Sequence, residues 1–359
     1  MERSSNIELY RIIVMLSIVA HHYVVNSGVL DIAKEDPTSL RSIYYYVFGA
    51  WGKVGINCFI LITGYFMCKS DITLQKFLKL LFEVLFYMVV VNAILIISGV
   101  EPLSVGAIWS DMQLMTDVSS CFTSCFIIFY LFIPFLNILI RNMTREQHLC
   151  LIILCLTVFT GVSSLMLGKV EMNYVVWFCV LYLISSYIRL YQHIKNVRWG
   201  RVMVGMIFLS MASIVGLLFL GDILDKSLPQ YFFLNDANKI LAVASAVSMF
   251  MYFKELRIPQ SKIINRVAQS CFGVLLIHAN SDGMRQWLWR DMLDVADHYY
   301  TDTFVLHSIL SVVGIYIVCT VIDQIRIGLI EKPFFKWLTG SRHFRILNEQ
   351  LMPCGDTER

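Results

Sequence analysis

Ten long apolar stretches, separated by short polar segments, form the main pattern along this chain. Each is close to the roughly 20 residues that an α-helix needs to cross the hydrocarbon core of a bilayer. We therefore predict an all-α integral membrane protein, a bundle of about ten transmembrane helices with both termini on one side. The predicted spans cover roughly residues 10–30, 44–68, 77–99, 120–140, 148–167, 172–190, 201–221, 237–253, 268–288 and 303–325.

The composition supports a membrane location and leaves little room for other domains. Hydrophobic residues make up 57% of the 359 positions and charged residues 15%, whereas a soluble domain carries about 25% charged residues. The connections between the spans are too short for an extramembrane domain. We predict a single transmembrane domain over residues 1–340 and a short tail over 341–359, so function should lie inside the bundle or at its mouths.

A secretory signal peptide is the alternative interpretation of the first apolar stretch, because Arg3 precedes it. Arg11 and the pair His21-His22 interrupt that stretch, and no cleavage site of small residues follows it. We interpret it as a retained helix.

The basic residues are distributed unevenly between alternate connections. With the N-terminus in the cytoplasm, the inner segments hold 21 of the 29 lysines and arginines, the outer segments hold seven, and Lys53 lies within the second span. This bias follows the positive-inside rule and predicts that both termini are cytoplasmic. The net charge of +3 gives no reason to expect a nucleic-acid partner, but the inner face would attract an anionic substrate.

The motifs of the commonest soluble chemistries are absent. The chain has no GxGxxG, P-loop, HExxH or GxSxG sequence. Nearly all of its ten cysteines lie within apolar stretches and none forms a CxxC pair, so we expect no metal site. Polar residues at membrane depth are more informative, because ionisable groups are costly there and mark functional sites by default.

The first span carries the most suggestive set of such residues. Ser5 and Glu8 have the spacing of a capping box, and Arg11 follows Glu8 on the same face. His22 lies 11 positions after Arg11, which is three helical turns plus about 20° and a rise of about 16 Å. His21 lies roughly 80° away from that stripe. Either His22 acts together with Arg11, or it is a packed histidine beside an arginine that reaches the surface.

Two later spans also contain polar residues at membrane depth. Lys53, Asn57 and Gly64 share a helical face, and a lysine inside a membrane needs a partner. In the ninth span, His278 is followed four positions later by Asp282. The carboxylate of Asp282 would either fix the tautomer of His278 or face water at the outer surface.

Five segments, in order along the chain, carry a resemblance to a known family. They are Glu8-Leu-Tyr-Arg11 followed after ten residues by His22, Gly55-Ile-Asn-Cys-Phe-Ile-Leu-Ile-Thr-Gly64-Tyr-Phe66, Tyr130-Leu-Phe-Ile-Pro134-Phe-Leu-Asn137, Ser270-Cys-Phe-Gly-Val-Leu-Leu-Ile-His278 and Glu331-Lys-Pro333-Phe334. Together they resemble the acyltransferase-3 family, membrane-bound O-acyltransferases that decorate bacterial cell-surface polysaccharides and other acceptors. The chain departs from the family pattern at Asn57, often an aspartate, and at Lys76 and Lys79, often arginines that present a bidentate fork to phosphate.

This resemblance implies an enzyme of the bacterial plasma (inner) membrane that transfers an acyl group, most simply from acetyl-CoA, to a hydroxyl of a polysaccharide or lipid-linked glycan. It implies that basic residues at the inner mouth hold the phosphates of the donor. A histidine would act as general base on the acceptor hydroxyl or take the acyl group itself. The candidate residues are Arg11, His22 and His278 for catalysis, Arg11, Lys76 and Lys79 for the donor, and Glu8, Lys53 and Asn57 for substrate or oxyanion contacts.

A transporter or flippase for a lipid-linked sugar or a small anion is the alternative function, because buried Arg, Lys and His residues serve translocation equally well. Against it, the chain shows no repeated half and no pair of interrupted helices in matching positions. A scaffold or sensor without chemistry would not need three deep ionisable sites.

The charge distribution also predicts sidedness for an acyltransferase. The loop 100–119 holds Glu101, Asp111 and Asp117 and no lysine or arginine. This loop is compatible with a neutral sugar that approaches from outside. We therefore expect acyl groups to enter from the cytoplasm and to leave onto an acceptor at the outer face.

Overall fold

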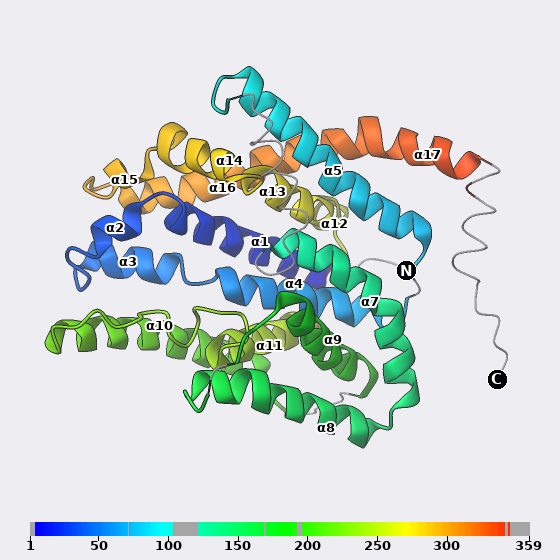
Figure 1. Ribbon diagram of the computed structural model, residues 1–359, viewed down its shortest axis with the longest axis horizontal. Coiled ribbons are helices and arrows are strands. Elements are labelled where there is room, and N and C mark those ends of the chain that lie inside the picture. Colours follow the sequence, from blue (N-terminus) through cyan, green and yellow to red (C-terminus); the bar gives the residue numbers. More distant parts are fainter. Residues whose placement is uncertain are drawn as a thin grey trace.

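The computed structural model describes residues 4–70, 72–102, 121–168, 170–191, 196–341 and 344, and every regular element in these ranges is a helix. The predicted acidic positions Asp111 and Asp117, and nearly all of the predicted tail 341–359, lie outside the described residues. The long helices lie side by side in a bundle (Figure 1). They are α1 (Ser5–Val25), α4 (Gly52–Met67), α5 (Leu74–Ile97), α7 (Phe122–Asn142), α9 (Tyr174–Tyr191), α10 (Trp199–Ile223), α11 (Ile240–Glu255) and α16 (Phe304–Arg326).

Shorter helical segments extend or connect the long ones. They are α2 (Val29–Ala33), α3 (Leu40–Phe48), α8 (Arg145–Cys155), η1 (Leu156–Val162), α12 (Lys262–Val267), η2 (Ala268–Ser270), α13 (Cys271–His278), α14 (Asp282–Gln286), η3 (Trp287–Met292), α15 (Val295–His298), η4 (Ile327–Glu331) and α17 (Lys332–Gly340).

Eight helical segments of the described chain are long and apolar enough to cross a membrane. Each overlaps one of the ten predicted spans, so the all-α membrane class is confirmed, while the count of ten stays a prediction. The eight segments are Ser5–Val25, Leu40–Met67, Leu74–Ile97, Phe122–Asn142, Arg145–Val162, Tyr174–Tyr191, Trp199–Ile223 and Phe304–Gly340.

The other two predicted spans, 237–253 and 268–288, have a different form. The first corresponds to α11, which has 16 residues and therefore a length of about 24 Å, short of a hydrocarbon core of about 30 Å. The second is not one helix. Its chain leaves the helical path at Ala279 and starts again at α14, where the hydroxyl of Ser281 caps the new helix by accepting the N–H of Met284 at 3.1 Å.

The start of α1 also differs from the sequence prediction. Ser5 is the first helical residue and makes no capping box with Glu8. Its hydroxyl instead bonds the side chain of Gln260 at 2.8 Å and accepts the N–H of Ser261 at 2.8 Å. The predicted capping box is wrong, because the Ser5 hydroxyl forms its hydrogen bonds with the segment before α12.

Helix α1 lies at the centre of the bundle and contacts α4, α11, α13 and α16. We call its two ends the Ser5 end and the Val25 end. Helix α16 runs antiparallel to it, so that α17 lies toward the Ser5 end (Figure 1). Apolar side chains on the outer helices are exposed, for example Phe208 on α10 at 71% and Ile97 on α5 at 85%. Such an apolar surface is suited to lipid.

Candidate active site

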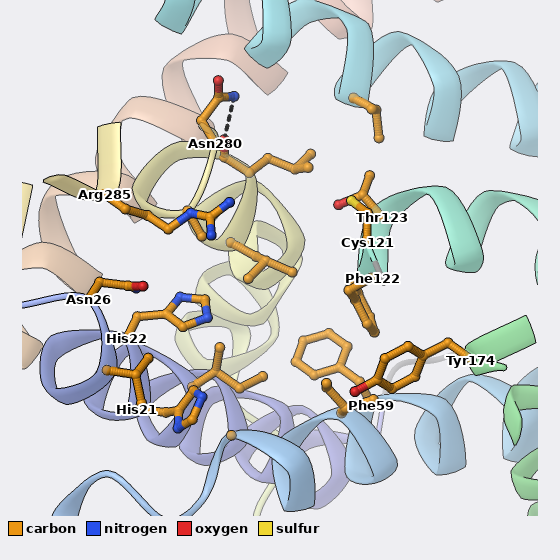
Figure 2. Close-up of a pocket in the computed structure, with 18 of the residues that line it drawn as sticks. His21, His22, Asn26, Phe59, Cys121, Phe122, Thr123, Tyr174, Asn280 and Arg285 are labelled. Atoms are coloured by element: carbon orange, nitrogen blue, oxygen red, sulfur yellow. Dashed lines mark hydrogen bonds between the residues drawn. The ribbon is translucent and has the colours of Figure 1, made fainter. Parts of the chain in front are cut away.

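A cavity of about 380 Å³ opens beside the last turn of α1, toward the Val25 end. Its size falls within the range of small-molecule sites. Figure 2 shows His22 and Arg285 on one wall, with Phe122 and Tyr174 on the wall that faces them. The polar and ionisable residues that line it are His21, His22, Asn26, Lys53, Asn92, Thr123, Tyr174, Asn280 and Arg285.

Two histidines that are far apart in sequence form the central polar contact of this site. Nδ1 of His22, on α1, lies 3.0 Å from Nε2 of His278, at the end of α13. Nδ1 of His278 lies 2.6 Å from the carbonyl oxygen of Val274, one turn earlier in the same helix. His278 is fully buried, whereas the ring of His22 points into the cavity (Figure 2).

These contacts determine which nitrogen of each ring carries a proton. A carbonyl oxygen only accepts hydrogen bonds, so Nδ1 of His278 holds the proton directed at Val274. Nε2 of neutral His278 is then an acceptor, and His22 donates to it from Nδ1. Nε2 of His22 keeps its lone pair, and it has no hydrogen-bond partner in the described part of the chain. This arrangement is what a general base at a cavity wall requires.

His21 also lines the cavity, but its contacts differ from those of His22. Its Nδ1 lies 2.6 Å from the carbonyl oxygen of Gly49, in the turn between α3 and α4. Its ring lies against Gly52 so closely that a Cβ atom there would collide with it. His21 therefore fixes the packing of α1 on the first turn of α4.

Lys53 has its partner in Tyr174, which also lines the cavity. Its ammonium group donates to the hydroxyl of Tyr174 at 2.5 Å, and that hydroxyl lies 3.4 Å from the carboxylate of Asp236. Tyr174 is the first residue of α9, so this contact joins α4 to α9 beside the cavity. An ammonium has three donors, which leaves Lys53 able to bond a ligand as well.

Asn57, one turn after Lys53 on α4, is fully buried and does not line the cavity. Its amide nitrogen donates to the carbonyl oxygen of Ala237 at 2.7 Å, and its oxygen accepts the indole N–H of Trp177 at 2.9 Å. These two bonds commit both ends of the amide to neighbouring segments. The structure thus separates Asn57 from the predicted oxyanion site.

The predicted donor residues lie toward the Ser5 end, apart from the cavity. Arg11 forms an ion pair with Glu8 at 3.7 Å and keeps about a quarter of its side chain exposed. Lys79 pairs with Glu331 at 3.6 Å, and Lys76 bonds the hydroxyl of Ser70 at 2.8 Å. Because α1 is continuous from Arg11 to His22, the predicted rise of about 16 Å between them holds in the structure.

No sequence pattern singles out Arg285 or Tyr174, and the spacing from His278 to Asp282 leaves the role of Asp282 open. Asp282 is 92% exposed and pairs with Arg285 at 3.2 Å. The idea that Asp282 fixes the tautomer of His278 is therefore wrong, since the carbonyl of Val274 does so. The one available signal for Arg285 is its position seven residues after His278. Tyr174 at a span boundary is typical of an interfacial anchor, which gives no catalytic signal.

The site as a whole combines one base, His22, and two cations, Lys53 and Arg285, with apolar lining residues in one cavity. Among the described residues, no group of three or more His, Cys, Asp or Glu side chains is arranged to hold a metal ion. A histidine with a free lone pair, beside positive groups that can stabilise a developing oxyanion, suits acyl transfer to a hydroxyl.

The comparisons with known proteins agree with this chemistry. A family model described as an acyltransferase domain matches residues 4–323, which include every residue that lines the cavity. The searches of curated proteins and of solved structures found no match. Because the family model covers most of the chain, this protein belongs to the acyltransferase-3 family of membrane acyltransferases.

Proposed function

We propose that this protein is an O-acetyltransferase of the bacterial plasma membrane, which moves an acetyl group from cytoplasmic acetyl-CoA to a hydroxyl of a cell-envelope glycan or glycolipid. Family membership supports the reaction class. The observation that carries the proposal is the pair His22–His278, which leaves Nε2 of His22 unprotonated at the wall of a cavity.

In this reaction His22 moves the proton and His278 positions it. As the acceptor oxygen attacks the thioester carbonyl carbon, its proton passes to Nε2 of His22 and a C–O bond forms. When the tetrahedral intermediate collapses, the C–S bond breaks and His22 returns the proton to the coenzyme A sulfur. Throughout, Nδ1 of His22 donates to His278, which holds the ring in place and stabilises the imidazolium.

Lys53 is the best-placed of the predicted oxyanion candidates. It lines the cavity and retains donor capacity beyond its bond to Tyr174. A fixed cation at the place where negative charge develops stabilises the transition state more than the ground state.

The donor would enter from the Ser5 end, where Arg11, Lys76 and Lys79 lie. Its phosphates would stay at that end, while the pantetheine arm reaches along α1 toward His22. The rise of about 16 Å between Arg11 and His22 is the distance along α1 that this arm would cover.

The test is an incubation of the purified protein in detergent with radiolabelled acetyl-CoA and an extract of cell-envelope glycans. Label transferred to glycan by the wild type, and lost in His22→Ala, supports the proposal. Arg201→Gln, a change on the exposed start of α10, is the control that should keep the activity. Uptake of a labelled lipid-linked sugar into proteoliposomes without coenzyme A, and no transfer, would instead assign the protein to the transporters.

A further inference from the structure

The cavity wall next to His22 carries positive charge that no lining carboxylate neutralises. In Figure 2 the guanidinium of Arg285 lies beside the His22 ring and points into the cavity. Its ion-pair partner, Asp282, is 92% exposed, so water screens that pair. Lys53 brings a second positive charge, which faces the carboxylate of Asp236 through the hydroxyl of Tyr174. Asp236 does not line the cavity, and among the described residues that do, none is an aspartate or glutamate.

The same wall holds buried polar atoms without partners in the described part of the chain. They are Nε of Arg285, Nδ2 of Asn26 and Oδ1 of Asn280. Asn280 uses its amide nitrogen on the carbonyl of Leu276 at 2.9 Å, which leaves its oxygen as an acceptor. Buried polar atoms are costly unless a partner satisfies them. These three atoms have almost no accessible surface, so a ligand in the cavity would bond them once their side chains rotate toward it. The Arg285 cation with the amide donor of Asn26 suits an anionic group, and the acceptor oxygen of Asn280 suits a hydroxyl on the ring that carries it.

The acyl donor does not bring such an anion to this position. The phosphates of coenzyme A lie at one end of the molecule, and the pantetheine arm that leads to the thioester is uncharged. With the thioester at His22, the proposed donor orientation places the phosphates toward Arg11, about 16 Å along α1. A permanent negative charge near Arg285 must therefore come from the acceptor.

We propose that Arg285 and Asn26 bind the carboxylate or phosphate of an acidic sugar acceptor, while Asn280 accepts a hydrogen bond from one of its hydroxyls. This inference rests on the proposed function, because only an acyltransferase has an acyl acceptor. It replaces the expectation of a neutral sugar, because that expectation came from the loop 100–119, whereas Arg285 lies at the cavity itself.

The test measures the binding of three matched sugars to the purified protein in detergent, without donor, by thermal stabilisation. The probes are methyl β-glucoside, methyl β-glucuronide and methyl β-glucoside 6-phosphate, which differ only at carbon 6. The wild type should bind the two anionic sugars about tenfold or more tighter than the neutral one, which is the effect of one charged hydrogen bond. Arg285→Gln should abolish this preference, Arg285→Lys should keep part of it, and Arg201→Gln should keep all of it.

Several results would overturn the inference. One is a wild type that does not distinguish the anionic from the neutral sugar, including one that binds neither. Another is an unchanged preference in Arg285→Gln. Displacement of the sugar phosphate by adenosine 3′,5′-bisphosphate would assign the site to the phosphates of the donor.

The binding assay is independent of acyl transfer. Loss of the preference in Arg285→Gln, together with no transfer from acetyl-CoA, would therefore leave this site standing while the proposed function fails. Should Arg285 serve only the oxyanion, its variants would bind all three sugars like the wild type, and the inference would be refuted.

Discussion

Replacing His278 tests the central contact of the site, because His278 touches His22 without lining the cavity itself. In His278→Phe a ring of similar size fills the buried space, but no acceptor remains for Nδ1 of His22. The proton of His22 is then free to move to Nε2, where it blocks the lone pair that faces the acceptor. His278→Gln is the matched control, since its amide oxygen reaches about as far as the imidazole Nε2 and can accept the same hydrogen bond.

The size of the effect follows from the role of His22. A positioned general base contributes about 10²- to 10⁴-fold to the rate, so removal of its orienting partner should lower kcat by about 10²- to 10³-fold. That decrease corresponds to about 2.7–4.1 kcal/mol of transition-state stabilisation. His278→Gln should stay within about tenfold of the wild type, a loss of about 1.4 kcal/mol at most. In either variant the carbonyl oxygen of Val274 loses the bond from the His278 ring. It keeps the helical bond from the backbone N–H of residue 278, four positions later in α13.

The assay is release of free coenzyme A thiol at saturating donor, with size-exclusion profiles to show that each variant is folded. The KM for acetyl-CoA should change little, because Arg11 lies toward the Ser5 end. Wild-type kcat in folded His278→Phe would refute the tautomer argument. A His278→Gln variant as inactive as His278→Phe would show that His278 does more than accept a hydrogen bond.

Four further outcomes are expected. His22→Ala should abolish acyl transfer, whereas His21→Ala should keep most of it but melt at a lower temperature, since it loses the Gly49 contact; equal loss of activity in two folded variants would contradict the assignment of the base. Arg11→Ala should weaken donor binding, Arg11→Lys should restore only part of it, and high salt should weaken the wild type, so a donor affinity indifferent to all three would place the phosphates elsewhere. Gly64→Ala should cost about 1–3 kcal/mol of stability, because its Cβ would meet Ser185 and Tyr182, while Gly205→Ala, with no described atom within 4 Å, is the control that should not destabilise the protein. In sealed vesicles, donor supplied to the cytoplasmic face alone should support transfer to an impermeant acceptor on the other face, and transfer only when both share the cytoplasmic side would exclude a route through the membrane.

The local pattern of the sequence determined the helices and the chemistry of α1. Apolar stretches of membrane length predicted each of the eight helical segments of the described chain that are long and apolar enough to cross a membrane, because burial of backbone groups in lipid requires helices. The spacing between Arg11 and His22 fixed their common stripe and their separation along the axis, since helical rise and rotation are set by the backbone alone.

Contacts between helices were decided only by the tertiary structure. His22 and His278 are 256 positions apart, and nothing in either segment specifies that their rings meet. Asn57 shares the face of Lys53, yet Trp177 and Ala237 take both ends of its amide.

The break after His278 shows the same limit of local pattern. An apolar run over 268–288 predicts one helix, but the chain turns at Ala279, and the cap at Ser281 redirects it into α14. That turn is what brings Arg285 to the wall beside His22. Periodicity determines which residues share a face of one helix, whereas side-chain packing among all the helices determines which faces meet around the cavity.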